Sequence, residues 1–115
     1  MSYDIGLAQR IREIIEEEPG FAERKMFGGI CFLLCGNMVC GIINDDLIVR
    51  VGANKYQEML KRKDTKEFDI TGKPMKGWVM ILSEALDTDK ALNTWVRRGV
   101  SFVRTLPPKS GVKTG

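Results

Sequence analysis

Histidine is absent from this chain of 115 residues, and cysteine is scarce. The missing imidazole removes the commonest general base and every Ser-His or Cys-His nucleophile pair. Lysine or carboxylate chemistry stays open, but the acidic residues are scattered, and each has a local role as a turn former or helix cap. We therefore expect a non-enzymatic protein without catalytic residues or a cofactor.

The few cysteines are Cys31, Cys35 and Cys40. The gaps of three and four residues between them are not the spacing of a zinc site, and there is no histidine to complete one. An odd number of cysteines inside apolar strands suits buried thiols in a reducing compartment better than disulfides. We expect buried cysteines, no metal site and a cytoplasmic location.

Long apolar runs are missing as well. No stretch approaches the roughly 18 apolar residues that a membrane-spanning helix needs. The first residues, Met1–Gly6, lack the basic and apolar regions of a signal peptide. The apolar share of 43% and the charged share of 29% are those of a globular protein, and the length suits one domain. We expect a domain at residues 1–108, a disordered C-terminal tail at residues 109–115, and no membrane partner.

Charge is absent from residues 30–43, which form two apolar runs broken by Gly36 and Asn37. This pattern is typical of a β-hairpin. An antiparallel sheet with one wet face alternates apolar and polar residues, and this hairpin does not. Both of its faces should therefore be covered, either by a helix of the same chain or by a partner. We predict a homodimer as the testable consequence.

Turn and cap signals divide the rest of the chain into helices and strands. Asp4 should cap a first helix that ends near Glu18. Arg24–Phe27 should lead into the first strand, with Gly28–Gly29 inside it as a bulge or a close approach to another backbone. The remaining strands are expected at residues 38–43, 47–51, 68–70 and 78–82, and the remaining helices at residues 52–63 and 88–106.

The last helix has the clearest pattern. Asp87 or Thr88 should cap it, Pro107 should end it, and Trp95 lies in the middle of its apolar stripe, which favours the core. The element order is helix, three strands, helix, two strands, helix. Neighbouring strands without strict β-α-β alternation predict a two-layer α+β domain with an antiparallel five-stranded sheet and three helices.

Positive charge is concentrated in the second half of the chain. Residues 1–58 hold six Lys and Arg against nine Asp and Glu, a net charge of −3, whereas residues 59–115 hold twelve against six, a net charge of +6. The basic half could meet an acidic partner or a phosphate backbone, although a solvated surface is the simpler explanation. No helix-turn-helix, zinc finger or RNA-type aromatic motif is present, so direct nucleic-acid binding is only an alternative. The cations concerned are Lys61, Arg62, Lys63, Lys66, Lys73, Lys76, Arg97, Arg98, Arg104 and Lys109.

The segment Thr71–Trp78 reads as a loop that ends at a tryptophan. Its Gly72–Lys73 pair resembles part of a phosphate-binding loop, but Pro74 stands where such a loop needs Ser or Thr. The loop could still bind a small anion, and its tryptophan suits either the core or the rim of a pocket. A ligand-binding domain is therefore a further alternative. The candidate interaction or anion contacts are Arg24, Lys25, Arg50, Lys73, Lys76 and Trp78.

Several segments, in a fixed order along the chain, carry a family signature. They are residues 24–29, 36–38, 47–52, 68–78 and 106–109, together with Phe32, Gly41, Trp95, Val96, Gly99 and Phe102. Together they resemble the TfoX N-terminal domain from about Asp4 to Lys109, and the run at residues 68–78 is the most specific part.

The resemblance implies a function in regulation. TfoX, also called Sxy, is a bacterial regulator of competence for DNA transformation, and it acts with a cyclic-AMP receptor protein at its target promoters. The family carries no established catalytic residues, so none is carried over. The implied fold is a two-layer α+β domain similar to secretion-chaperone-like domains, in which dimers are plausible. Full-length members carry a second, helical domain after this one, whereas this chain stops at Gly115, so we expect a stand-alone protein that resembles the N-terminal domain. We expect a regulatory protein-interaction module that acts in transcription through such a partner.

Overall fold

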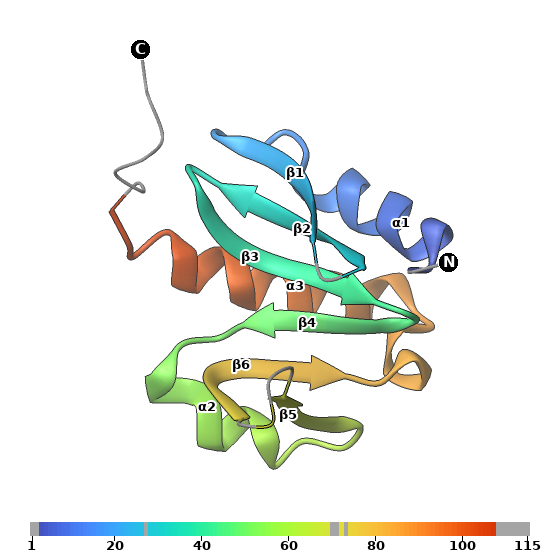
Figure 1. Cartoon of the computed structure of the whole chain (residues 1–115), viewed down its shortest axis with the longest axis vertical. Helices are drawn as coiled ribbons and strands as arrows, with labels where there is room; N and C mark the ends of the chain where they lie inside the picture. The colour runs from blue at the N-terminus through green and yellow to red at the C-terminus, as the bar shows by residue number, and fades with distance from the viewer. Residues whose placement is uncertain (1–2, 27, 70–71, 73, 108–115) are drawn as a thin grey trace.

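In the residues that it describes, 3–26, 28–69, 72 and 74–107, the computed structural model has six strands and three α-helices (Figure 1). The strands are β1 (Phe21–Met26), β2 (Gly29–Leu34), β3 (Asn37–Ile43), β4 (Asp46–Arg50), β5 (Thr65–Asp69) and β6 (Pro74–Ile81). The helices are α1 (Ile5–Ile15), α2 (Ala53–Leu60) and α3 (Asp89–Val103), with a short 3-10 helix, η1 (Ser83–Leu86), before α3. The strands form one sheet in the order β1-β2-β3-β4-β6-β5, and every neighbouring pair is antiparallel.

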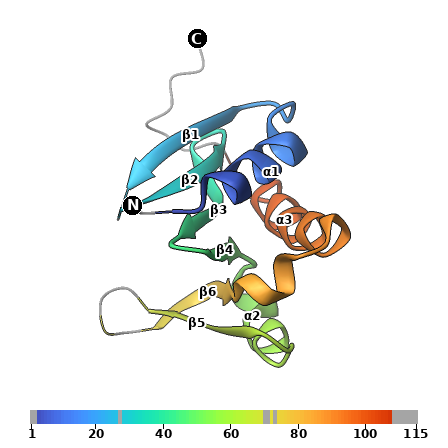
Figure 2. The same ribbon diagram turned by 90° about the vertical axis from the view of Figure 1, so that its right-hand side faces the viewer.

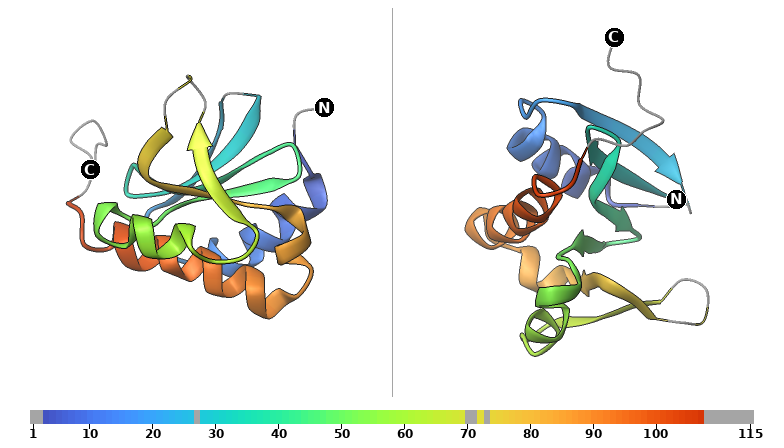
Figure 3. Two further views of the ribbon diagram at one scale, coloured as in Figure 1. Left: turned by 90° about the horizontal axis from the view of Figure 1, so that it is seen from below. Right: turned by 90° about the vertical axis from the view of Figure 1, so that its left-hand side faces the viewer.

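The helices lie together on one side of the sheet (Figure 3). Helix α3 packs on β3 and β4, α1 packs against α3, and α2 packs against β5 and β6. Strand β1 and the β5–β6 pair project from the two ends of the sheet toward its other side (Figure 2). The predicted α+β class with an antiparallel sheet and three helices is therefore confirmed.

The predicted number of strands is wrong, because the sheet has six strands and not five. The extra strand is β1, which was expected to continue through the glycine pair into the hairpin. Gly28 instead takes a φ of +75°, which reverses the chain, so that β1 and β2 pair antiparallel from Phe21 opposite Leu34 to Met26 opposite Gly29. The close backbone approach is real at Gly29, where a Cβ would collide with the Ile42 carbonyl oxygen.

The core lies between the sheet and the helices, mainly α1 and α3, with Tyr56 and Met59 contributed by α2. Trp95 is only 6% exposed, which confirms its predicted place in the core. Gly99 lets α3 approach the sheet closely, because a Cβ there would lie 2.8 Å from the Val39 carbonyl oxygen. The largest fully buried side chains include Phe32, Ile11, Ile15, Leu34, Leu47, Ile81 and Leu92.

The second face of the apolar hairpin is covered by the chain itself. Cys31 of the hairpin and Ile48 of the neighbouring strand β4 point away from the helical layer, yet they are only 4% and 1% exposed. Across a small cavity of about 80 Å³ they face Phe68, Met75 and Trp78 from the β5–β6 pair. The cover is therefore a pair of strands, and the hairpin supplies no exposed apolar face that requires a partner. The homodimer stays a prediction.

The helix caps follow the sequence. The Asp4 carboxylate accepts a hydrogen bond of 3.1 Å from the Leu7 amide, as predicted. Of the two predicted caps of α3, Thr88 is the one that acts: its hydroxyl accepts a hydrogen bond of 3.1 Å from the Ala91 amide. Each such cap contributes about 1 kcal/mol to stability.

The remaining expectations concern the cysteines, membrane-spanning helices and the C-terminal tail. Cys31, Cys35 and Cys40 are free; the first and last are buried, and burial raises the pKa of both thiols. Within the described part of the chain, no helix is long and apolar enough to cross a membrane. The tail at residues 109–115 lies outside the described residues, so its disorder stays a prediction.

Candidate functional site

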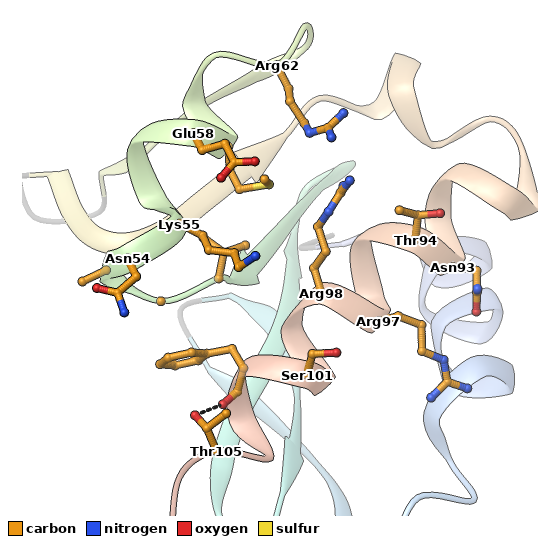
Figure 4. A pocket seen from close by; sticks show the side chains of 15 residues that line it. Asn54, Lys55, Glu58, Arg62, Asn93, Thr94, Arg97, Arg98, Ser101 and Thr105 are labelled. Atoms are coloured by element: carbon orange, nitrogen blue, oxygen red, sulfur yellow. Dashed lines mark hydrogen bonds between the residues drawn. The ribbon is translucent and has the colours of Figure 1, made fainter.

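A broad groove runs between α2 and α3, with a volume of about 1060 Å³ (Figure 4). Lys55, Glu58 and Arg62 line it on the side of α2, and Arg98 and Ser101 line it on the side of α3. Its floor is formed where β4 passes into α2. The groove is much larger than the cavity of about 80 Å³ beside Cys31.

Helical periodicity directs these side chains into the groove. Thr94, Arg98 and Ser101 on α3, and Thr105 just after its end, follow one another at intervals of four, three and four residues, so they form one polar stripe. That stripe runs beside the buried stripe that contains Trp95. The groove therefore has a wall of polar side chains that stands directly on the core.

Backbone hydrogen bonds to β6 hold the start of α2 beside α3. The Val51 and Gly52 amides both donate to the Gly77 carbonyl oxygen of β6, at 2.8 and 3.0 Å. Gly52 has φ 88° and ψ 154°, a region that essentially only glycine occupies. A Cβ at this position would also lie 2.5 Å from the ring of Phe102 on α3. Gly52 thus allows the start of α2 to come against α3 and sets the width of the groove at this end.

The charge in the groove is mainly positive. The Arg98 guanidinium carbon lies 4.5 Å from the centre of the Trp95 ring, and its side chain extends toward Arg62 (Figure 4). Burial lowers the pKa of Arg98, repulsion by Arg62 lowers it further, and Glu58 acts in the opposite direction. Arginine remains protonated at any physiological pH. Two cations therefore converge at one point of the groove.

Ion pairs neutralise other cations of the chain but not these. Within the described residues, ion pairs shorter than 4.0 Å join Arg10 to Asp89, Arg12 to Glu23, and both Arg97 and Arg104 to Glu18. None of the ion pairs in this part of the chain involves Lys55, Arg62 or Arg98. Arg97 also lines the groove, but its guanidinium is directed to the far side of α3, where Glu18 lies (Figure 4).

Of the predicted contact residues that the structure describes, it brings two together. Arg50 stands opposite Trp78 in the β4–β6 pair, and its guanidinium carbon lies 5.4 Å from the centre of the Trp78 ring and 5.4 Å from that of Phe102. This cation is held between two aromatic rings, each contact being worth about 0.5–1 kcal/mol at an exposed site. Phe102 lines the groove, so Arg50 supports the groove wall from behind.

The other predicted contacts are dispersed. Arg24 and Lys25 are exposed on β1, at the edge of the sheet opposite β5 and β6. Lys76 is exposed on β6, and Lys73 lies outside the described residues. The six residues therefore do not form one cluster, and ligand binding by any of them stays a prediction.

Sequence reasoning missed the groove itself. It counted Arg62, Arg97 and Arg98 among the basic residues of the second half, but it did not place them, and it did not single out Lys55 or Glu58. The polar stripe beside the apolar stripe of α3 was a usable signal. The position of α2 against α3 has no such signal in the sequence, because it depends on the backbone hydrogen bonding between Gly52 and Gly77.

Among the described residues, no group of three or more Cys, Asp or Glu side chains could hold a metal ion. Both walls of the groove lie within residues 53–105.

Comparison with known proteins places this region in a family. The family model described as the TfoX N-terminal domain matches residues 13–103, which include all six described strands and every residue that lines the groove except Thr105. The chain belongs to the TfoX N-terminal domain family. This confirms the resemblance seen in the sequence. A search of curated proteins finds no match to this TfoX N-terminal domain.

A solved structure shares the fold. The crystal structure of the Deinococcus radiodurans protein DR2400, which contains a domain of the family model DUF419, superposes with a TM-score of 0.62. The two chains are 15% identical, and the match covers 93% of this chain and 82% of the other. At this identity the similarity concerns the fold alone.

Proposed function

We propose that this TfoX N-terminal domain is a non-enzymatic regulatory module of the competence-regulator type, which works in the cytoplasm by binding a protein partner in the α2–α3 groove. The carrying observation is the groove within the family-matched region, where Arg62 and Arg98 converge and Lys55 lines the same wall as Arg62. None of the three has an ion-pair partner among the described residues. By family resemblance, the partner is a transcription factor of the cyclic-AMP receptor protein type at promoters of DNA-uptake genes.

Gene deletion and complementation test this proposal. Deletion of the gene should lower the transcripts of DNA-uptake genes, and the wild-type chain should restore them. The Arg98→Glu variant should fail to restore them, whereas Lys66→Glu, the same charge change on exposed β5, should succeed. Unchanged transcripts after deletion, or full restoration by Arg98→Glu at equal protein level, would contradict the proposal.

The purified partner provides a second, direct measurement. Calorimetric titration of a cyclic-AMP receptor protein with the wild-type chain should show binding that Arg98→Glu weakens and Lys66→Glu leaves unchanged. Equal affinity of all three chains would remove the groove from the interaction.

Homodimerisation is proposed as a separate property of the module. The edge strand β1 leaves backbone groups that a second copy could pair with. Light scattering at micromolar concentrations should show twice the mass of 13.0 kDa. A single monomeric species over this range would remove the dimer.

Direct nucleic-acid binding is the second candidate function, because Arg62 and Arg98 in the groove both come from the basic half of the chain. Phosphate contacts make affinity fall steeply with salt. A titration of duplex DNA at increasing salt therefore tests this candidate, and no binding at low salt would end it.

Anion binding by the segment Thr71–Trp78 remains the other alternative. Thr71 and Lys73 lie outside the described residues, and the Arg50 guanidinium already stands between two rings. A ligand that binds the native state raises the melting temperature. A thermal-shift screen of nucleotides and small anions is the appropriate measurement, and a response abolished by Lys76→Ala would support this segment.

A further inference from the structure

We infer that the α2–α3 groove takes a single acidic, amphipathic helix of a partner protein, with its carboxylates between Arg62 and Arg98 and its apolar side chains on the groove floor. This inference rests on the proposed function, because it assigns the occupant of the same groove.

The length of the groove suits an elongated ligand. Its lining residues on the α3 side extend from Asn93 to Thr105. At 1.5 Å per residue, that stretch is about 18 Å long, or about three turns of a helix. The volume of about 1060 Å³ is also at the upper end of what small-molecule pockets occupy. A short helix lying along α2 and α3 would use the whole groove, whereas a small anion would use only a part of it.

The floor suits apolar side chains. Val51, Ala53, Met59 and Phe102 line the groove beneath its polar rim. Phe102 is half-buried, so part of its ring remains accessible, whereas Val51 and Met59 are buried and form the base on which the groove rests. An apolar floor between two helices, with polar residues along the rim, is the arrangement that receives an amphipathic helix.

The charges select an acidic occupant. Arg62 and Arg98 extend toward each other, and their mutual repulsion is one cause of the lowered pKa of Arg98. A carboxylate between two guanidinium groups would accept charge-assisted hydrogen bonds from both and would remove the repulsion. Lys55 stands on the same wall as Arg62, about two helical turns earlier, so a second carboxylate can be placed along the occupant.

Shape separates a protein helix from a nucleic acid. A duplex presents its phosphates on a convex surface, and cations that protrude reach them best. Arg98 is instead half-buried and lies over the face of Trp95. A single strand is bound by stacking its bases on aromatic rings. The Trp95 face is already occupied by Arg98, which leaves only Phe102 among the rings that line the groove.

A display experiment tests the occupant directly. The full chain is immobilised, and randomised 15-residue peptides are selected for binding. The enriched peptides should contain more Asp and Glu than the starting library, with apolar residues at helical spacing. Binding of each enriched peptide is then measured by fluorescence anisotropy to the wild-type chain, to Arg98→Glu, to Arg62→Glu and to the charge-matched control Lys66→Glu.

The two groove variants should each weaken binding at least about tenfold, as expected for loss of one partner of a desolvated charge pair. Lys66→Glu should bind like the wild type. Replacement of one peptide Glu by Lys should restore affinity to Arg98→Glu and weaken it for the wild type, which only a direct contact produces. Arg62 is exposed, so Arg62→Glu remains informative if Arg98→Glu folds poorly; circular dichroism checks the folding of both variants.

Three results would overturn the inference: no enrichment of any peptide, enriched peptides without excess acidic residues, or enriched peptides that bind the groove variants as well as the wild type. Fifteen-nucleotide single strands and duplexes are measured in parallel. If nucleic acid binds and acidic peptides do not, and if Arg98→Glu weakens the binding of nucleic acid, the groove would serve the second candidate function instead. Failure of the peptides together with failed complementation by Arg98→Glu would leave the proposed function standing and reject only this occupant.

Discussion

The two flanks of α3 carry arginines of the same kind in opposite surroundings. On the flank toward α1, Arg97 and Arg104 both hold the Glu18 carboxylate, at 2.8 and 2.6 Å. On the flank toward α2, Arg98 faces Arg62. Residues adjacent in a helix point in directions about 100° apart, so Arg97 and Arg98 meet different neighbours.

The difference separates stability from binding. Partly exposed ion pairs such as those of Glu18 contribute about 0–1 kcal/mol each, and they join the segment after α1 to the C-terminal part of α3 and its cap. The cations of the other flank have no carboxylate within ion-pair distance among the described residues, and one of them repels another. A cationic groove that is maintained without a gain in folding energy is suited to a ligand that supplies the missing negative charge.

The largest expected effect comes from displacing α3, which disturbs the contacts on both of its flanks. Gly99→Leu should lower the free energy of unfolding by about 3 kcal/mol, because its side chain would collide with Val39 and lift α3 from the sheet. Urea unfolding measures the change. Lys90→Leu places the same side chain at an exposed position of α3, and it should stay within about 0.5 kcal/mol of the wild type. Equal stability of Gly99→Leu and the wild type would show that α3 does not dock as described.

The next effect concerns the α1 flank alone. Glu18→Gln should lower the free energy of unfolding by about 1 kcal/mol, since it removes two ion pairs at once. Peptide binding in the groove should not change. A variant that loses peptide affinity but not stability would reverse the roles assigned to the two flanks.

The same carboxyl predicts a pH dependence. Hydrogen bonds from Arg104 and Arg97 lower the pKa of Glu18 from its ordinary value of 4.5 in the folded protein. Its contribution to stability is therefore complete above about pH 4.5 and is lost as the pH falls through the lowered pKa. Urea unfolding between pH 6 and pH 3 should show a shallower decline for Glu18→Gln than for the wild type. Part of the remaining decline should come from Glu23, whose pKa is lowered by Arg12.

A smaller effect is expected from Arg104→Gln, which removes one of the two ion pairs of Glu18 and leaves the other. The free energy of unfolding should fall by about 0.5 kcal/mol. Combination with Glu18→Gln should add little more, because both substitutions break the same pair. Full additivity in the double variant would mean that the two side chains act independently.

The smallest effect on stability is expected at the groove. Arg98→Gln loses the contact with the Trp95 ring, worth about 0.5–1 kcal/mol, but it also ends the repulsion by Arg62. The two changes oppose each other, so the free energy of unfolding should change by less than about 0.5 kcal/mol. Complementation of the gene deletion should nevertheless fail. A stable variant that complements fully would contradict the proposed function of the groove.

Local signals in the sequence were sufficient for much of the fold. Asp4 and Thr88 cap their helices, and Trp95 lies in the core, because caps and apolar stripes depend on nearby residues. The pair Gly28–Gly29 was ambiguous, since glycine suits both a bulge and a reversing turn. Only the pairing of β1 with β2 decides between them, and that pairing is a contact between segments.

The groove and the cover of the hairpin have the same limitation. Phe68 and Trp78 reach the second face of the hairpin only because the β5–β6 pair projects from the end of the sheet. Arg62 and Arg98 meet only because Gly52 and Gly77 hold α2 beside α3. These residue types are evident in the sequence, but local sequence patterns do not determine the distances between segments that are remote in the chain.

The position of Arg98 over Trp95 has an optical consequence. The chain contains two tryptophans, Trp78 and Trp95, and the second has a guanidinium 4.5 Å from its ring centre. A carboxylate that draws this guanidinium away changes the electric field at the indole, and hence the wavelength and intensity of its emission. In a Trp78→Phe background, Trp95 would be the sole indole, and the protein would report occupancy of its groove by its own fluorescence, without an attached dye.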